Sequence, residues 1–288
     1  MAKPTQKQES NTSLKGTIWL AVLAAILLII TNSAIWLNNQ IFDTENFSKT
    51  ATDSLTSEKS RTAIATGLTD RAFEGRPILR NVAGDVPVKI VGGLLGTEQA
   101  AKGIDKVTSK FHVMLTSENR ESVVLELSGL KSIMTQLYDT STNLGREPKI
   151  DPSKIPEEIV LVDANKLPNI YKVTVAFLWL APLAFIGAFL SLAYPYFKNP
   201  RKYRVILAIQ GGIVAFAGLM ALSAGPLFKP PLLSNIQTGT GRIVVENLYD
   251  AFIATFNTQS LYLFGIGVVA LATSGGLYVF QLVRAKKK

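Results

Sequence analysis

Four long runs of apolar residues organise the chain. They cover residues 17–37, 173–197, 205–228 and 261–283, and none of them contains Asp, Glu, Lys, Arg or His. A helix needs roughly 20 apolar residues to cross the hydrocarbon core of a bilayer, and each run exceeds that length. The pattern therefore predicts an α-helical membrane protein with four transmembrane helices.

The first run has an alternative interpretation as a cleaved signal peptide. Asn32-Ser33-Ala34 resembles the small-residue site at which such peptides are cut. However, the run is longer than the ~7 to 15 apolar residues of a signal peptide. Trp19 and Trp36 also lie near its two ends, where their rings suit the membrane interface. We therefore favour an uncleaved span that follows a polar tail of residues 1–16.

The basic residues are distributed unevenly among the polar segments. The net charge of +9 arises in residues 1–16, 198–204 and 284–288, whereas basic and acidic residues nearly balance in 38–172 and 229–260. Short segments rich in Lys and Arg stay on the cytoplasmic side of a membrane. We therefore expect the three basic segments inside and the two balanced segments outside. The basic excess reflects topology, so we expect no nucleic-acid partner.

Residues 38–172 are long enough to form an extracytoplasmic domain of their own. Ser57 can cap one helix, and a second amphipathic helix covers 97–115. Two short β-branched segments, 123–127 and 158–162, flank a helical pattern and predict a small parallel pair of strands. The expected domain is therefore α+β and mostly helical, with a small two-strand element.

The second outer segment begins with Pro230-Pro231 and continues into a predicted amphipathic helix, 242–256. The apolar face of this helix requires burial against lipid or against residues 38–172. We predict the second, because Glu246 and Asp250 would be repelled by anionic headgroups, whereas residues 38–172 offer basic partners. The residues expected in this contact are Val244, Leu248 and Phe252.

Few side chains suit catalysis or metal binding. The chain has no Cys, which excludes thiolate sites, and a single His, which excludes sites with several His ligands. That residue, His112, lies on the predicted 97–115 helix, where packing is a commoner role than general base. Asp43 and Glu45 follow the first span at headgroup level and form a candidate polar site, although the favoured role of Asp43 is to cap the next helix. We predict no catalytic residue, metal or cofactor.

Glycine pairs interrupt the third and fourth spans at Gly211-Gly212 and Gly275-Gly276. Small residues four apart let helices approach closely, so Gly211 with Ala215, and Ala272 with Gly276, predict packing contacts. Interrupted spans also occur in transporters. Charged residues that mark ion paths in such proteins are absent from all four runs, which favours packing.

Several short motifs together resemble a family of four-span integral membrane proteins of actinobacteria and related bacteria. The family has no established activity, so the resemblance implies only the topology and a location in the bacterial plasma membrane. The stretches that carry it are Trp36-Leu37, Phe42-Asp43-Thr44-Glu45-Asn46-Phe47, Leu68-Thr69-Asp70-Arg71, Val124-Leu125-Glu126-Leu127-Ser128, Ile155-Pro156, Ile159-Val160-Leu161 and the basic turn 198–204.

These observations favour a non-enzymatic protein of the cell envelope that displays residues 38–172 for binding a partner protein, a lipid or a wall component. The alternatives are a transporter or transporter accessory subunit, and a membrane-surface hydrolase acting through Asp43 and Glu45. Expected partners are the lipid bilayer, an envelope protein or a second copy of the chain. Basic residues near a membrane attract anionic lipid, and those expected to do so are Lys198, Arg201, Lys202, Arg204, Lys286, Lys287 and Lys288.

Overall fold

A computed structural model describes residues 6–75, 77–118, 121–126, 158–162, 170–234 and 236–286. The helical pattern expected between the two strands lies outside these residues. In chain order the elements are α1 (Gln6–Trp36), the π-helix η1 (Leu37–Ile41), α2 (Thr44–Thr56), α3 (Glu58–Ala72), α4 (Pro77–Ala83), α5 (Val86–Leu95), α6 (Glu98–Thr116), β1 (Val123–Glu126), β2 (Glu158–Val162), α8 (Tyr171–Lys198), the 3₁₀ helix η4 (Pro200–Lys202), α9 (Tyr203–Leu222), α10 (Ala224–Ser234) and α11 (Gly239–Lys286).

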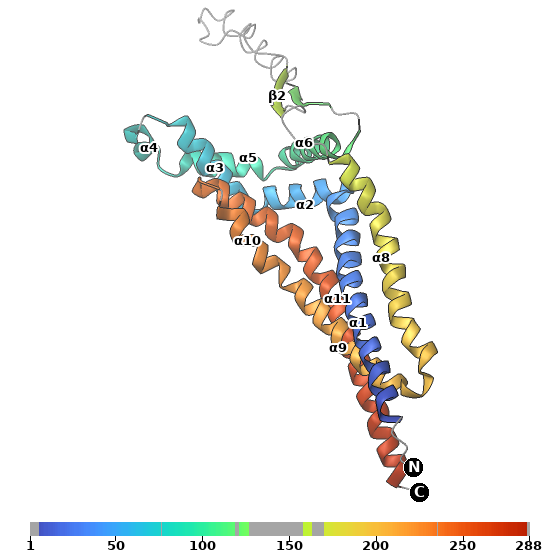
Figure 1. Ribbon diagram of the computed structural model, residues 1–288. Coiled ribbons are helices and arrows are strands. Elements are labelled where there is room, and N and C mark those ends of the chain that lie inside the picture. The colour runs from blue at the N-terminus through green and yellow to red at the C-terminus, as the bar shows by residue number, and fades with distance from the viewer. Residues whose placement is uncertain are drawn as a thin grey trace, which may run out of the picture.

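In the described part of the chain, four helical segments are long and apolar enough to cross a membrane, as predicted. They cover Lys15–Ile41, Tyr171–Lys198, Pro200–Ser234 and Gly239–Ala285. Figure 1 shows both termini and the turn between α8 and α9 at one end of this bundle, and α2 to α6 with both strands at the opposite end. We call α2 to α6 with β1 and β2 the distal unit.

The closest contact in the bundle lies between α9 and α11 and depends on glycine. A methyl group added at Gly267 would lie 2.6 Å from Cα of Ala215, and one added at Gly218 would lie 2.6 Å from Cα of Phe264. Gly211 meets the α11 backbone in the same way, so the predicted Gly211–Ala215 contact is confirmed. The contact predicted at Gly276 is wrong, because open space surrounds that residue.

Two boundaries differ from the predictions. Pro230 and Pro231 lie inside α10, so they do not begin the second outer segment. The predicted helix 242–256 and the fourth span are parts of one 48-residue helix, α11. The polar stretch Asn257-Thr258-Gln259-Ser260 contains neither Gly nor Pro, which break helices. The side chains of Gln259 and Ser260 bond to Asn32 of α1, and that of Thr258 bonds within α11, so the helix continues through the stretch.

Helix caps in the distal unit are those that the sequence indicates. The Ser57 hydroxyl accepts a hydrogen bond from the Ser60 amide at the start of α3, and Thr97 accepts one from Ala100 at the start of α6. After α3 the chain turns through Gly75, whose φ of 77° favours glycine. Both helices therefore begin where predicted.

The two predicted strands pair, but their orientation was predicted wrongly. β1 and β2 are antiparallel, with Val123 opposite Val162 and Leu125 opposite Ile159. Apart from this pair, the described part of residues 38–172 is helical, which does not support an α+β class for the domain. Strand orientation depends on the connecting segment, and the strand residues themselves do not encode it.

His112 fastens α6 to the junction between α1 and α2. It is buried, and its Nε2 donates to the carbonyl of Ile41, 2.7 Å away, in η1. This leaves Nδ1 to accept from the Thr44 hydroxyl at 3.0 Å. Burial lowers the pKa of His112, while the hydrogen bond to Ile41 and the charge of Asp43 partly oppose this effect. The imidazole is therefore held neutral.

Acidification should weaken this junction. The unfolded chain takes up a proton at His112 near pH 6.5, whereas the folded protein takes it up only at a lower pH. Neutral His112 therefore stabilises the fold fully above pH 6.5, and this stabilisation declines as the pH falls below 6.5. We expect the melting temperature to fall more between pH 7.5 and pH 5 in the wild type than in His112→Gln, measured by tryptophan fluorescence. Equal losses in the two proteins would refute this role for His112.

Candidate ligand-binding groove

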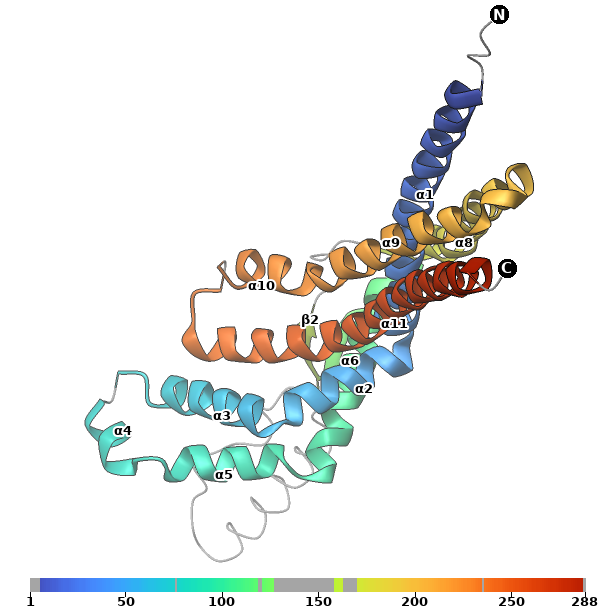
Figure 2. The same cartoon turned by 90° about the horizontal axis from the view of Figure 1, so that it is seen from below.

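A candidate groove lies in a layer of helices at the distal end. In Figures 1 and 2, α10, the first part of α11, α3 and α5 lie side by side in this layer. Close contacts hold it together. A methyl group added at Gly67 of α3 would lie 3.2 Å from Thr240 Oγ1 of α11, and one added at Gly92 of α5 would contact Ala65 of α3. The layer thus joins the distal unit to the longest helix of the bundle.

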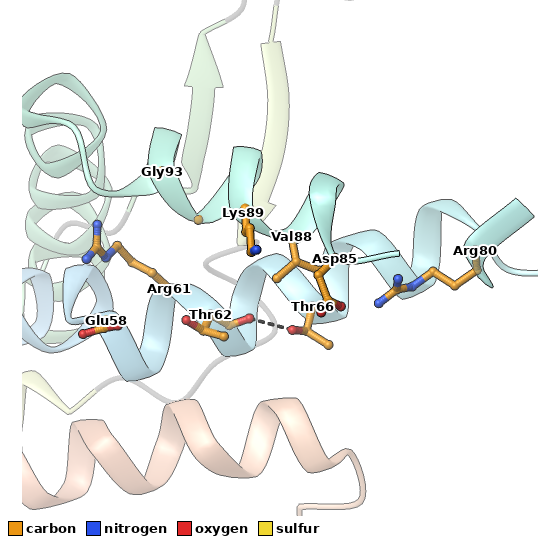
Figure 3. A pocket seen from close by; sticks show the side chains of 10 residues that line it. Glu58, Arg61, Thr62, Thr66, Arg80, Asp85, Val88, Lys89 and Gly93 are labelled. Atoms are coloured by element: carbon orange, nitrogen blue, oxygen red, sulfur yellow. Dashed lines mark hydrogen bonds between the residues drawn. The ribbon is translucent and has the colours of Figure 1, made fainter. Parts of the chain in front are cut away.

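A groove of about 590 Å³ separates α3 from α5 and reaches α4 (Figure 3). Figure 3 shows the Arg61 side chain extending from α3 towards α5, and Lys89 pointing from α5 towards α3. The lining residues are Glu58, Arg61, Thr62, Thr66, Arg80, Asp85, Val88, Lys89, Gly92 and Gly93. Three cationic side chains therefore converge on one groove.

Two of these cations have no acidic partner among the described residues. Neither Arg61 nor Lys89 forms an ion pair within the part of the chain that the structure describes. Nε of Arg61 is buried and lacks a hydrogen-bond acceptor among the same residues. A buried donor without an acceptor carries a free-energy cost. Rotation of the guanidinium towards an anionic oxygen in the groove would remove that cost.

The third cation, Arg80, is already engaged. Its Nε donates to the Asp70 carboxylate at 2.9 Å, and Nη1 donates to the carbonyl of Gly84. These bonds fasten α4 to α3 and fix the guanidinium at the mouth of the groove. Arg80 therefore contributes positive potential, while the donors available to a ligand belong to Arg61 and Lys89.

The remaining polar lining makes the groove mixed in character. Glu58 and Asp85 add two carboxylates to the three cations. Thr62 and Thr66 add hydroxyl groups, and the Thr66 hydroxyl donates to the Thr62 carbonyl at 2.8 Å. Such a lining suits a ligand that combines an anionic group with hydroxyl or ammonium groups.

The candidate polar site at Asp43 and Glu45 is part of a helix start. The Asp43 carboxylate accepts from the Asn46 amide at 2.8 Å and caps α2, and Glu45 lies in the first turn. A carboxylate in the first turn stabilises a helix through its dipole. Among the described residues, no group of three or more His, Cys, Asp or Glu side chains could hold a metal ion.

The predicted contact of α11 with residues 38–172 is present, and it includes hydrogen bonds in addition to the expected apolar packing. Phe252 packs its ring on Phe47 of α2, with centroids 5.3 Å apart, and Asn247 bonds to the α2–α3 junction. Glu246 and Asp250 form their ion pairs with Lys229 of α10, whose hydrogen bond lowers the pKa of Glu246. Of the expected basic partners in the described part of residues 38–172, only Lys59 of α3 contributes, because its charge helps to lower the pKa of Glu246. Lys229 is nearer along the chain than any base of the distal unit.

The described residues among those expected to contact anionic lipid lie at the turn between α8 and α9 and, for Lys286, at the end of α11. Lys198, Arg201, Lys202 and Arg204 lie at the turn between α8 and α9, at the end opposite the groove (Figure 1). A pocket of about 470 Å³ at this end is lined by Tyr203, Gln281 and Arg284, among others. Lys287 and Lys288 lie outside the described residues.

Sequence reasoning missed the groove residues. Lys89 is the only charged residue of the short apolar helix Val86–Leu95, which is the one signal that could have singled it out. Arg61 is separated from it by 27 intervening residues, and only the fold brings the two together. Comparison of the chain with protein-family models, with curated proteins and with solved structures finds no match in any of the three.

Proposed function

We propose that this protein is a non-enzymatic, membrane-embedded binding protein of the bacterial envelope. Its distal unit receives a phosphate-bearing ligand in the groove between α3 and α5. The basic termini and the 198–204 turn are cytoplasmic in this proposal, which places the distal unit on the outer side. The ligand is a phosphate of a lipid headgroup or of an anionic wall polymer, because both present the same chemistry to the groove.

One observation supports this proposal above the others. Arg61 and Lys89 converge on the groove without acidic partners among the described residues, and the buried Nε of Arg61 lacks an acceptor. Charge-assisted hydrogen bonds to phosphate are about twice as strong as neutral ones. The neighbouring carboxylates and Thr hydroxyls favour ligands that also carry hydroxyl or ammonium groups.

Removing either cation should weaken phosphate binding. A hydrogen bond to a charged group contributes about 1.5 to 3 kcal/mol, so Lys89→Ala and Arg61→Ala should each raise Kd roughly tenfold or more. The measurement is calorimetric titration of the full chain, held in phosphatidylcholine nanodiscs, with soluble poly(glycerol phosphate). A parallel measurement by native mass spectrometry counts phosphatidylglycerol molecules retained by the same variants and identifies a lipid source.

Two further variants make the test specific. Gly96→Ala keeps every charge but places a methyl group 2.9 Å from Cζ of Arg61, so it should displace the guanidinium and weaken binding with little effect on melting temperature. Lys102→Ala removes an exposed cation of α6, paired with Glu98, and should leave Kd unchanged. Absence of binding by both probes, or equal weakening by Lys102→Ala and Lys89→Ala, would refute the proposal.

A further inference from the structure

We infer that an apolar ridge on α4 and α5 inserts into the outer leaflet of the bilayer that surrounds the bundle. The ridge consists of Ile78, Val82, Val86, Ile90 and Leu94, which recur at every fourth position. This inference concerns how the distal unit meets the membrane, and it does not depend on the ligand proposed for the groove.

The ridge is unusually exposed. The exposed fractions of its five side chains are 78%, 82%, 62%, 59% and 62% in chain order. Within α4 and within α5, a spacing of four residues places these side chains on one face of the helix, and a turn at Gly84 separates the two helices. Exposed apolar faces of this kind mark a place of contact with another apolar phase. At 10 residues, α5 is too short to span a bilayer, but an amphipathic helix can lie in its interface.

The position of the ridge favours lipid as that phase. Figure 2 looks at the molecule along the bundle from the end of the termini, and α3, α4 and α5 project to one side without being covered by the candidate spans. Their underside therefore faces the space that a bilayer around the spans would fill. In the same layer α10, which belongs to the third candidate span, also exposes the large apolar side chains of Leu227, Phe228 and Leu232.

Lys89, which lines the groove, also borders the ridge. Lys89 lies between Val86 and Ile90 in the sequence, and its aliphatic stem can follow the ridge while its ammonium group reaches the headgroups.

Two other occupants could in principle cover an apolar ridge, namely a second copy of the chain or a soluble partner. Here either would have to enter between the helical layer and the bilayer, because the spans stand beside the ridge (Figure 2). The outer leaflet already occupies that position in a membrane-embedded protein. We therefore commit to lipid and treat the other occupants as outcomes of the test.

The test uses single cysteines labelled with bimane, which the chain permits because it has no native Cys. Val82→Cys and Ile90→Cys probe the ridge. Phe189→Cys, exposed on α8, is the lipid-facing control, and Glu121→Cys, exposed just before β1, is the water-facing control. The full chain is placed in phosphatidylcholine vesicles with or without bromine on the acyl chains, so no anionic ligand is present and the groove does not affect the result.

We expect bromolipid to quench the labels at positions 82 and 90 at least half as strongly as the label at 189. Aqueous iodide should quench them several-fold less than the label at 121. Iodide quenching equal to that at 121, without bromolipid quenching, would overturn the inference. Energy transfer between differently labelled copies at position 82, again without bromolipid quenching, would also overturn it and assign the ridge to a second copy.

Discussion

Replacing Gly267 with alanine is expected to disrupt the contact between α9 and α11. The added methyl group would lie 2.6 Å and 2.8 Å from Cα and Cβ of Ala215, so the helix backbones must move apart. Overpacking of this kind costs about 3 kcal/mol or more at its upper range, which lowers the melting temperature by roughly 6 to 12 °C. Gly218→Ala should act similarly through Phe264. Thermal unfolding followed by tryptophan fluorescence measures both changes.

The matched control is a neighbouring glycine on the same helix. Gly265 has no atom within 4 Å of an added methyl group, so Gly265→Ala should gain up to about 1 kcal/mol from helix propensity. Glycine-to-alanine substitution should therefore raise the free energy of unfolding at position 265 and lower it at position 267. Equal melting temperatures for Gly265→Ala and Gly267→Ala would show that the helices do not approach each other as described.

Asn247→Leu is expected to loosen the distal unit from the bundle. The Asn247 amide nitrogen lies 2.9 Å from the Ser54 carbonyl, 2.7 Å from Ser57 Oγ and 2.9 Å from Ser60 Oγ. The Ser54 carbonyl would keep its bond from the Ser57 hydroxyl, but the buried Ser60 hydroxyl would lose the donor that Asn247 supplies and would face an apolar side chain. The loss should reach about 2 kcal/mol, or roughly 30-fold in the local opening equilibrium.

Hydrogen exchange can resolve where that loss occurs. Because a loss of about 2 kcal/mol raises the local opening equilibrium roughly 30-fold, amides of α3 should exchange roughly 30-fold faster in Asn247→Leu. The exchange rates of α9 amides should not change. Thr258→Val is the control, because the Thr258 hydroxyl bonds to Ala254 of its own helix. Unchanged exchange in α3 would mean that the network at Asn247 does not join the two parts of the molecule.

The four spans and the helix starts could be predicted because each depends on local chemistry. An uncharged run of sufficient length has few alternatives to a membrane helix. Ser57, Thr97 and Asp43 each cap the helix that follows, and a cap requires only a side-chain oxygen and an amide three positions on. The close contact of Gly211 and Ala215 with α11 was likewise visible in their spacing.

The groove and the length of α11 could not be predicted because they depend on tertiary structure. Arg61 and Lys89 lie on different helices, and no local pattern states that these helices are neighbours. Polar residues 257–260 suggested a boundary, yet their bonds to α1 and to their own helix keep α11 continuous. The ion-pair partner of Glu246 and Asp250 could not be predicted for a related reason, since charge balance cannot show that Lys229 folds back beside them.

We expect the unbroken α11 to act as a lever. Its close contact with α9, which runs from Phe264 to Leu271 and is centred near Gly267, would serve as the pivot. At 1.5 Å per residue, the arm towards Gly239 is about 42 Å long and the arm towards Lys286 about 28 Å. If α11 moves as a rigid body, a sideways shift of about 2 Å at Thr240, where α3 contacts α11, would move Lys286 by about 1.3 Å in the reverse direction. Occupation of the distal groove would then have a mechanical output among the basic residues at the other end of the chain.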